Sequence, residues 1–470
     1  MKVEQLYTGC LAEAAYYIES NGEVAIIDPL RETAPYIKKA EAAGARIKYV
    51  FETHFHADFV SGHVDLAKRT GATIVYGPTA SPSFDAYIAK DGEEFRLGNI
   101  TIKALHTPGH TPESTCYLCL DENGEQYCVF TGDTLFIGDV GRPDLAQKSA
   151  NKTEEEMAGD LYDSLRTKII PLNDNVLVYP AHGAGSACGK NMSKETFDTL
   201  ANQKKSNYAL SNISKEAFVK ELTTGILPPP QYFSKNAQMN KEGIDSIDAV
   251  FERGLHALDA EQFEQAANET GALILDVRSA EEFAKGFIPN AIFIGLDGQF
   301  APWVGALITD LHQPILLVTP EGREEETVKR LARVGYDYTI GYLKGGFATW
   351  LASRKEADKV DEVEAQKFGA LAKESELNVI DVRKPGEYEA EHVEGVGNKP
   401  LDFINDWMGD INKNNRYYLH CAGGYRSMIT ASILKARGFD DVVNIKGGYS
   451  AIKNESGLKT TDFSCPSKRN

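Results

Sequence analysis

The stretch 49–63 reads YVFETHFHADFVSGH and brings together side chains that bind metal ions. His54, His56 and Asp58 stand at H-x-H-x-D spacing, directly after an apolar run that predicts a β-strand. Imidazole and carboxylate groups are common ligands of zinc and iron. The next position is Phe59, whose ring offers no lone pair to a metal. The motif predicts a metal site at a strand end, from which Phe59 removes one potential ligand.

Three further donors each follow an apolar run: His110 in HTPGHTPES, Asp133 in VFTGDTLF and His182 in VYPAHGAGS. A lone histidine is more often a hydrogen-bonded structural residue than a ligand. Here, however, histidines and aspartates recur at the ends of several predicted strands. This clustering favours one metal centre over separate structural roles.

A second kind of chemistry is indicated by the stretch 416–428, RYYLHCAGGYRSM. An apolar run leads to Cys421 in a Gly-rich loop, Arg426 follows with four residues between, and a helix-like stretch comes next. Loop N–H groups and a helix N-terminus would stabilise a thiolate and then an anionic persulfide. Arg426 would bind an oxyanion such as sulfite or thiosulfate. A buried structural cysteine, the alternative, leaves the loop and Arg426 unexplained.

The C-terminal half contains an internal repeat. The segment 273–291, LILDVRSAEEFAKGFIPNA, matches 378–396, NVIDVRKPGEYEAEHVEGV, and a KGGF element in the first copy matches KGGY in the second. Strand-like and helical runs alternate in each copy, which favours a mainly parallel sheet. Aligning LVTPEGRE of the first copy on LHCAGGYR puts Thr319 at the position of Cys421 and Glu324 at that of Arg426. The first copy is therefore predicted to be catalytically silent, with a role in packing or substrate positioning.

These elements divide the chain into three predicted domains. The first closes at LPPPQYF, whose prolines cannot continue a helix or a central strand. An acidic stretch around KEADKVDEVE separates the two repeat copies. The expected domains are 1–235, which holds the metal motifs, 250–357, the silent copy, and 358–470, the copy with Cys421.

Two further features leave alternatives open. Cys188 lies in a polar, Gly-rich loop after His182 and is followed by Lys190, at an expected helix start, all of which would lower the pKa of its thiol. It is either a functional thiol that carries persulfide sulfur or an ordinary buried cysteine. In GDVGRPDL, Arg142 and Asp144 form either an ion pair beneath the metal site or a simple loop salt bridge.

The metal motifs, in their order over 1–235, resemble the metallo-β-lactamase superfamily, a four-layer αββα fold, and within it first the persulfide dioxygenases and then glyoxalase II. That resemblance implies one Fe(II) held by His54, His110 and Asp133, with His56, Asp58 and His182 orienting ligands or substrate. In the dinuclear hydrolases of this superfamily a histidine stands where Phe59 stands here, which argues against a two-zinc centre. The DVR motifs, the Glu-Tyr continuation and the C-x4-R loop resemble the rhodaneses, α/β domains with mainly parallel sheets.

The combination resembles a persulfide dioxygenase–rhodanese fusion. It implies oxidation of a low-molecular-weight thiol persulfide by O₂ to sulfite, with the thiol being glutathione, coenzyme A or a similar carrier. Cys421 would transfer sulfane sulfur, forming or using thiosulfate. A second hypothesis is a zinc-dependent thioester hydrolase like glyoxalase II, with zinc on His54, His56, His110 and Asp133. A third is a non-enzymatic sensor or scaffold.

Composition limits the partners and the compartment. The chain of 470 residues has a net charge of −18, which argues against nucleic acid or an anionic membrane as partner. No apolar run is long enough to span a bilayer, and MKVEQLYTG lacks the features of a signal peptide. Seven cysteines, an odd and low number, do not indicate a disulfide framework. We therefore expect a cytoplasmic protein, and the family resemblance implies a homo-oligomer.

Overall fold

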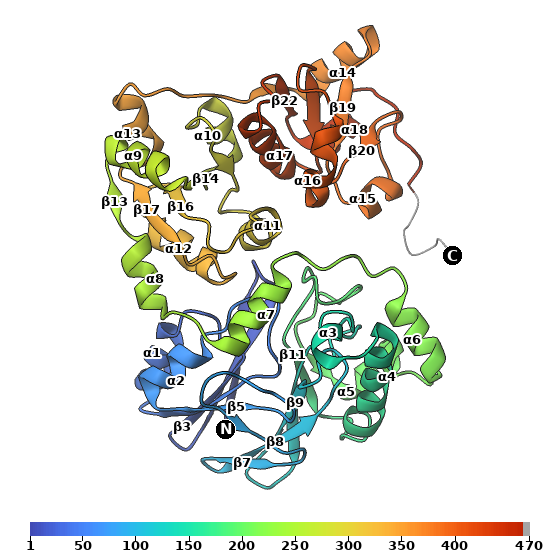
Figure 1. Cartoon of the computed structure of the whole chain (residues 1–470). Coiled ribbons are helices and arrows are strands. Elements are labelled where there is room, and N and C mark those ends of the chain that lie inside the picture. Colours follow the sequence, from blue (N-terminus) through green and yellow to red (C-terminus); the bar gives the residue numbers. More distant parts are fainter. Residues whose placement is uncertain (464–470) are drawn as a thin grey trace. The chain divides into compact units, whose positions relative to one another are not determined.

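The computed structural model describes residues 1–463, except for the side chains of residues 148 and 149. The chain forms two compact units (Figure 1). One unit contains Met1–Ala249 together with Lys329–Gly335, and the other contains Val250–Val328 and the chain from Tyr336 onward. Within the described residues, no helix is both long enough and apolar enough to cross a bilayer.

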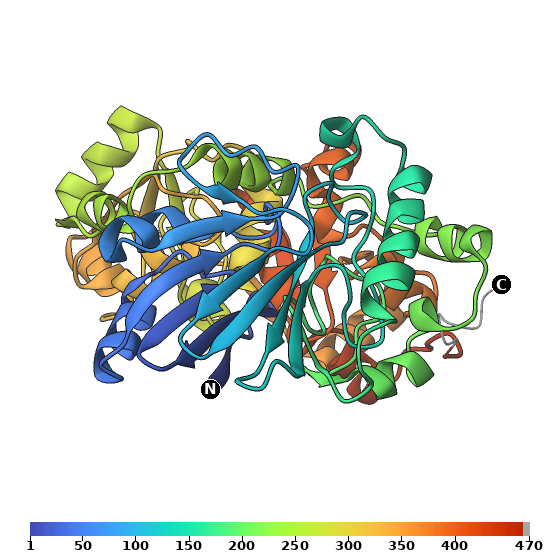
Figure 2. The same ribbon diagram turned by 90° about the horizontal axis from the view of Figure 1, so that it is seen from below.

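The first unit is built on two six-stranded sheets (Figure 2). In the first sheet the strands follow their sequence order, antiparallel from β1 to β3 and parallel from β3 to β6. The second sheet is antiparallel from β7 to β10, after which β11 pairs parallel with β10 and β12 antiparallel with β11. The strands are β1 (Lys2–Thr8), β2 (Glu13–Ser20), β3 (Glu23–Ile27), β4 (Arg46–Phe51), β5 (Thr73–Tyr76), β6 (Tyr87–Ile88), β7 (Glu94–Leu97), β8 (Ile100–His106), β9 (Thr115–Leu120), β10 (Gln126–Gly132), β11 (Leu177–Pro180) and β12 (Asp198–Thr199).

Helices cover the outer face of each sheet (Figure 1). The helices are α1 (Ala34–Ala42), α2 (His63–Thr70), α3 (Gln147–Ala150), α4 (Glu154–Ser164), the π-helical turn η1 (Leu165–Ile169), α5 (Leu200–Ser206), the 3₁₀ turn η2 (Tyr208–Leu210), α6 (Lys215–Thr223), α7 (Phe233–Glu242) and α8 (Ile247–Gly254), which lies where the two units divide.

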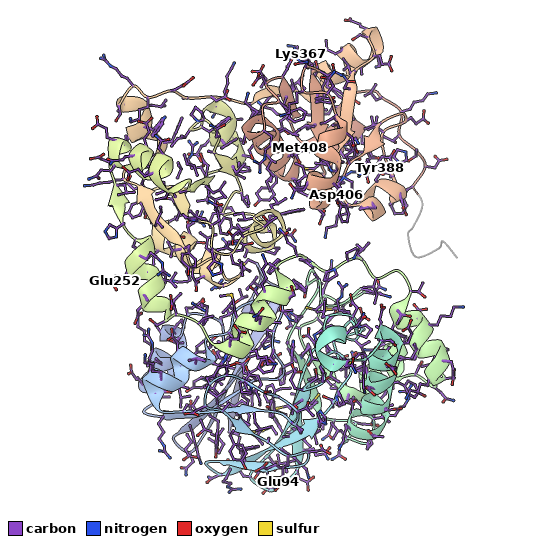
Figure 3. All side chains as sticks on the ribbon, in the orientation of Figure 1. Glu94, Glu252, Lys367, Tyr388, Asp406 and Met408 are labelled. Carbon is purple, nitrogen blue, oxygen red and sulfur yellow. The ribbon has the colours of Figure 1, made fainter. Side chains whose placement is uncertain are left out.

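Three apolar clusters hold these layers together. One lies between the sheets and includes Tyr16, Phe51 and Phe130. The other two join α1 and α2 to the first sheet, and α4 and α6 to the second. Strand β2 is almost wholly buried because it lies between a helix layer and the other sheet. The four-layer αββα fold expected from the motifs is confirmed, and side chains fill the space between the ribbons (Figure 3).

The second unit contains two five-stranded parallel sheets with the same topology. The spatial order is β13-β17-β16-β14-β15 in the first copy and β18-β22-β21-β19-β20 in the second. The first copy contains β13 (Ala257–Leu258), α9 (Ala260–Thr270), β14 (Leu273–Asp276), α10 (Ala280–Lys285), β15 (Ile292–Phe293), α11 (Phe300–Leu307), β16 (Ile315–Val318), α12 (Glu324–Ala332), β17 (Thr339–Leu343) and α13 (Gly346–Ala352). The second contains β18 (Asp361–Val363), α14 (Ala365–Glu374), β19 (Asn378–Asp381), α15 (Pro385–Ala390), β20 (Gly397–Asn398), η3 (Leu401–Phe403), α16 (Ile404–Trp407), η4 (Met408–Asp410), β21 (Tyr417–His420), α17 (Tyr425–Ala436), β22 (Val442–Ile445) and α18 (Gly448–Glu455).

The two sequence elements that the copies share make the same contacts in each. The Arg383 guanidinium binds the buried Asp381 carboxylate at 2.6 Å and lies 4.0 Å from the centre of the Tyr449 ring. In the first copy Arg278 binds Asp276 at 2.6 Å and lies 4.4 Å from the Phe347 ring. The DVR arginine thus stacks on the aromatic residue of KGGF or KGGY, so the two motifs occur together for a structural reason.

Helix α7 fixes the metal-motif loop through one buried side chain. The Asn240 amide donates to the carbonyl oxygens of His56 and Phe59, at 2.8 and 2.7 Å, and its Oδ1 accepts from the Ser61 backbone N–H at 2.8 Å. Asn240 is 1% exposed, so water does not compete for these bonds. The loop between the H-x-H-x-D motif and α2 therefore depends on a residue far along the chain.

We expect Asn240→Ala to lower the free energy of unfolding of the first unit by about 3 kcal/mol, because it leaves several buried backbone groups unpaired. Gln238→Ala, at an exposed position of the same helix, is the matched control and should change stability by less than about 0.5 kcal/mol. Urea denaturation of the full chain measures both. Equal stabilities of the two variants would contradict the role assigned to Asn240.

Candidate metal centre and sulfurtransferase site

Three of the predicted ligands meet in a buried cluster at the strand ends. His54 follows β4, His110 lies in the turn after β8, and Asp133 follows β10. One ligand atom from each lies within 4.8 Å of those of the other two. The Nε2 atoms of His110 and His54 lie 3.4 and 4.0 Å from Asp133 Oδ2.

The donor set fits a bound cation. Asp133 is 2% exposed, and among the described residues neither of its carboxylate oxygens has a hydrogen-bond partner. A buried ionised carboxylate without partners is strongly unfavourable unless a cation neutralises it. Burial, reinforced by the neighbouring imidazoles, holds the pKa of His54 well below its usual value, so its ring stays neutral as a metal ligand requires.

Backbone and hydroxyl groups orient the two imidazoles. His110 Nδ1 donates to the carbonyl oxygen of Arg142 at 2.7 Å, which directs Nε2 toward Asp133. His54 Nδ1 lies 3.0 Å from Thr53 Oγ1, and that hydroxyl donates to Asp28 Oδ2 at 2.8 Å. Because the Thr53 hydroxyl is committed to Asp28, it accepts the His54 Nδ1 proton and leaves Nε2 free to bind a metal.

The remaining predicted donors form a second group beside the first. Ligand atoms of His56, Asp58 and His182 lie within 4.8 Å of one another, and His182 Nε2 is 3.4 Å from Asp133 Oδ1. His56 Nε2 also lies 3.0 Å from Asp28 Oδ1. Burial opposes ionisation of His56, but Asp28 and then Glu52 outweigh it and raise its pKa well above the usual value.

Phe59 packs beside this second group and supplies no donor. Its ring is fully buried and lies 4.4 Å from the His56 ring, centre to centre. The side chain at this position therefore contributes apolar contact where a histidine would contribute a lone pair.

Cys188 lies beside the candidate metal ligands, but the expectation of a lowered pKa for its thiol is wrong. Its sulfur atom and one ligand atom each of Asp133 and His182 lie within 4.8 Å of one another. Burial, together with the carboxylates of Asp58 and Asp133, raises the pKa of the Cys188 thiol well above its usual value. No helix begins at Cys188, and the Lys190 amine donates to backbone carbonyls of residues 221, 222 and 224.

Arg142 and Asp144 form a bidentate ion pair, with nitrogen–oxygen distances of 2.6 and 2.7 Å. The same guanidinium donates to the carbonyl oxygens of Ala187 and Leu227, at 3.3 and 2.6 Å. The Arg142 backbone N–H donates to the Cys188 carbonyl at 3.0 Å. Together with its carbonyl bond to His110, Arg142 joins the Cys188 loop to a candidate metal ligand, which is more than a loop salt bridge requires.

The sequence analysis missed Asp28, Thr53 and Asn240. Asp28 could have been found, because it ends the apolar run EVAIID in the way that Asp133 ends YCVFTGD. Thr53 stands next to His54 but carries no spacing signal. Asn240 lies 184 positions from His56, and a single sequence does not connect them.

The Cys421 loop presents its sulfur to backbone and hydroxyl donors. The Gly424 N–H donates to Cys421 Sγ at 3.1 Å, and Ser427 Oγ lies 3.6 Å from it. The KGGY element is hydrogen-bonded to the backbone of this loop, since the Tyr449 N–H donates to the Cys421 carbonyl at 2.6 Å. Gly448 permits this approach: its φ is +55°, and an added Cβ would lie 2.4 Å from that carbonyl oxygen.

Arg426 is paired, which differs from the free oxyanion-binding cation that the sequence indicated. Its guanidinium donates to both carboxylate oxygens of Glu387, at 2.5 and 2.8 Å. Glu387 lies in α15 directly before Tyr388, which is labelled in Figure 3. Burial opposes ionisation of Glu387, but the Arg426 guanidinium outweighs it and lowers the pKa of that carboxyl. The pair leaves less net positive charge at Cys421 than Arg426 alone would give.

We expect Thr53→Val to weaken metal binding about 10- to 100-fold, because the His54 ring loses the acceptor that sets its tautomer. Thr53→Ser keeps the hydroxyl and should retain most of the affinity. Anaerobic titration of metal-free protein with Fe(II) measures both variants. The assignment fails if the valine variant binds iron as tightly as the serine variant.

Comparison with known proteins agrees with this architecture. The Metallo-beta-lactamase superfamily profile matches residues 8–182, and the Rhodanese-like domain profile matches residues 259–353 and 364–455. The human mitochondrial persulfide dioxygenase ETHE1 is 33% identical over 211 residues, covering 44% of this chain and 74% of the human protein. A probable hydroxyacylglutathione hydrolase of Schizosaccharomyces pombe is 30% identical over 182 residues, covering 38% of this chain and 66% of that protein.

Among solved structures, a metallo-beta-lactamase from Staphylococcus aureus is 31% identical and superimposes with a TM-score of 0.66, covering 73% of this chain and 99% of that one. The expected domain types and their order are thus confirmed. The chain belongs to the metallo-β-lactamase superfamily and is a fusion of a domain related to the persulfide dioxygenases with two rhodanese-like domains.

Proposed function

We propose that the first domain is an Fe(II)-dependent dioxygenase of low-molecular-weight thiol persulfides and that Cys421 carries out sulfurtransfer. The cluster of His54, His110 and Asp133 carries this proposal. Two imidazoles and one carboxylate on one face are the donor set of non-haem Fe(II) oxygenases. When bound, Fe(II) supplies open positions for a sulfur anion and O₂ and the redox chemistry that Zn²⁺ lacks.

The protein's own groups hold these donors in place. The Arg142 carbonyl and the Thr53 hydroxyl keep the Nδ1 protons of His110 and His54 on the far side of the rings. Phe59 adds an apolar wall beside the site and argues against a complete second zinc site. Cys188 lies near enough to Asp133 to contact a sulfur substrate, but the raised pKa of its thiol does not favour uptake of sulfane sulfur.

The overall reaction is balanced with O₂ and water. The outer sulfur of R–S–SH becomes sulfite, O₂ supplies two of its oxygens, water supplies the third, and R–SH is released with two protons. At the other site, Cys421 takes a sulfane sulfur and passes it to sulfite, which gives thiosulfate, or the reaction runs in reverse to supply thiol persulfide. Covalent fusion raises the effective concentration of each site for the other's product.

The alternative is a zinc-dependent thioester hydrolase. Two observations keep it in view: the relative named as a hydroxyacylglutathione hydrolase, and the second donor group of His56, Asp58 and His182. Phe59, which supplies no ligand for a second zinc, and the two rhodanese-like domains both count against the hydrolase.

The identity of the metal decides between the two reactions. We expect the Fe(II)-loaded protein to consume O₂ when glutathione persulfide is added and to form sulfite or thiosulfate, whereas the zinc-loaded protein does neither. His110→Ala should lower iron content and O₂ uptake together, because it removes one of the three donors. An oxygen electrode and sulfite analysis measure the reaction. Thioester cleavage by the zinc form, without O₂ uptake by the iron form with any thiol persulfide, would support the hydrolase instead.

The role of Cys421 can be tested by removing its thiol. We expect Cys421→Ser to lower sulfurtransfer from thiosulfate at least about a thousandfold, because a serine hydroxyl is not ionised at neutral pH. Thr319→Ala, at the corresponding position of the silent copy, is the control and should leave transfer unchanged. Thiocyanate formation from thiosulfate and cyanide measures it. Unchanged transfer in the serine variant would leave the tandem rhodanese half as a sensor or scaffold.

A further inference from the structure

A pocket of about 410 Å³ opens at Cys421, and both rhodanese-like copies line it. Gln299 and Trp303 come from the first copy, although that copy has threonine at the catalytic position. The remaining lining residues come from the second copy and include Lys384, Glu387, Cys421, Tyr425 and Arg426. The silent copy therefore forms part of the wall that a substrate of Cys421 would meet.

Contacts within this unit hold that wall against the active loop. Tyr425, the first residue of α17, donates its hydroxyl to the Gly295 carbonyl at 2.7 Å. Its ring lies so close to Gly298 that an added Cβ there would come within 2.4 Å of it. The Phe293 backbone N–H donates to Ser432 Oγ at 2.9 Å. These contacts involve residues 293–298, which lead directly to Gln299. They therefore fix the position of Gln299 relative to the Cys421 loop.

The chemistry of the wall suits an organic substrate better than a small inorganic anion. Trp303 and Tyr425 are aromatic and Gln299 carries an exposed neutral amide, so the added wall brings no charge. Of the two cations in the lining, Arg426 is paired with Glu387, and Lys384 comes from the second copy. A pocket of this size lies in the range used for small organic ligands, whereas sulfite or thiosulfate would fill only a small part of it.

We propose that Gln299 and Trp303 of the silent copy bind the carbon skeleton of a low-molecular-weight thiol, so that Cys421 exchanges sulfane sulfur with an organic thiol carrier. This inference rests on the sulfurtransfer proposed for Cys421. It gives the silent copy a function, as a specificity wall for the neighbouring active site.

The exchange needs no external oxidant or reductant. In the forward direction the Cys421 thiolate attacks the outer sulfur of R–S–SH, the S–S bond of the donor breaks, and R–S⁻ leaves while Cys421 carries the persulfide. In the reverse direction the thiolate R–S⁻ attacks the outer sulfur of the Cys421 persulfide and regenerates the Cys421 thiolate. The pocket wall acts on R in both directions, whereas an acceptor without a carbon skeleton of this size does not reach it.

The test compares two sulfur acceptors with one donor. Full-length protein is assayed anaerobically, so that the metal centre cannot consume persulfide, with thiosulfate as donor and either glutathione or cyanide as acceptor. The variants are Gln299→Ala, at an exposed position, and Trp303→Phe, which keeps an aromatic ring in a buried position. Trp350→Phe is the matched control, because Trp350 lies in α13 of the same copy but does not line the pocket.

We expect both variants to raise the KM for glutathione about tenfold more than the KM for cyanide, with a smaller effect on kcat, and the Trp350 variant to leave this ratio unchanged. Equal losses of activity with both acceptors would indicate a structural role for the two residues. No loss with either acceptor would indicate that they do not contact the substrate. Each result overturns the inference. A wild-type protein that transfers sulfur to cyanide but not to glutathione, cysteine or coenzyme A also overturns it. If no Cys421-dependent transfer to any acceptor occurs, the sulfurtransferase proposal itself fails.

Discussion

The constraint on which the first domain depends is the buried carboxylate of Asp133. Its two oxygens face different imidazoles, Oδ2 toward His54 and His110 and Oδ1 toward His182, without a hydrogen bond among the described residues. A charge in such surroundings costs several kcal/mol unless a cation offsets it. Folding therefore builds a candidate site that a bound metal would stabilise, and neighbouring hydrogen-bonding groups orient two of its imidazoles.

The supporting groups explain why a loop-based site can be rigid. Thr53 and Asp28 set the tautomer of His54, and the Arg142 carbonyl sets that of His110. Asn240 fixes the backbone between the H-x-H-x-D motif and α2. Arg142 also reaches the loop of Cys188. A change at any of these positions would act on metal binding without removing a ligand, which is how supporting hydrogen bonds tune a metal site.

In the proposed function, the second unit stabilises and selects a sulfur anion. The loop around Cys421 supplies an N–H donor and a nearby hydroxyl, and the pair of Arg426 with Glu387 limits the positive charge beside them. In both copies the DVR arginine and the KGG-aromatic element form a common structural support. The first copy has this support with threonine at the position of the cysteine, and its Gln299 and Trp303 line the pocket at Cys421.

Several features could be predicted from the sequence alone: the strand-end positions of the candidate metal donors, the αββα domain, the two copies of the α/β domain and the threonine that replaces the cysteine in one copy. These features depend on residue type, spacing and hydrophobic period, which are local properties of the chain. Only the tertiary structure decided that Cys188 is deeply buried, that Arg426 is paired with Glu387 and that Asn240 holds the metal loop. Each of these depends on contacts between residues distant in sequence, and burial reversed the pKa shift that the local surroundings of Cys188 had indicated.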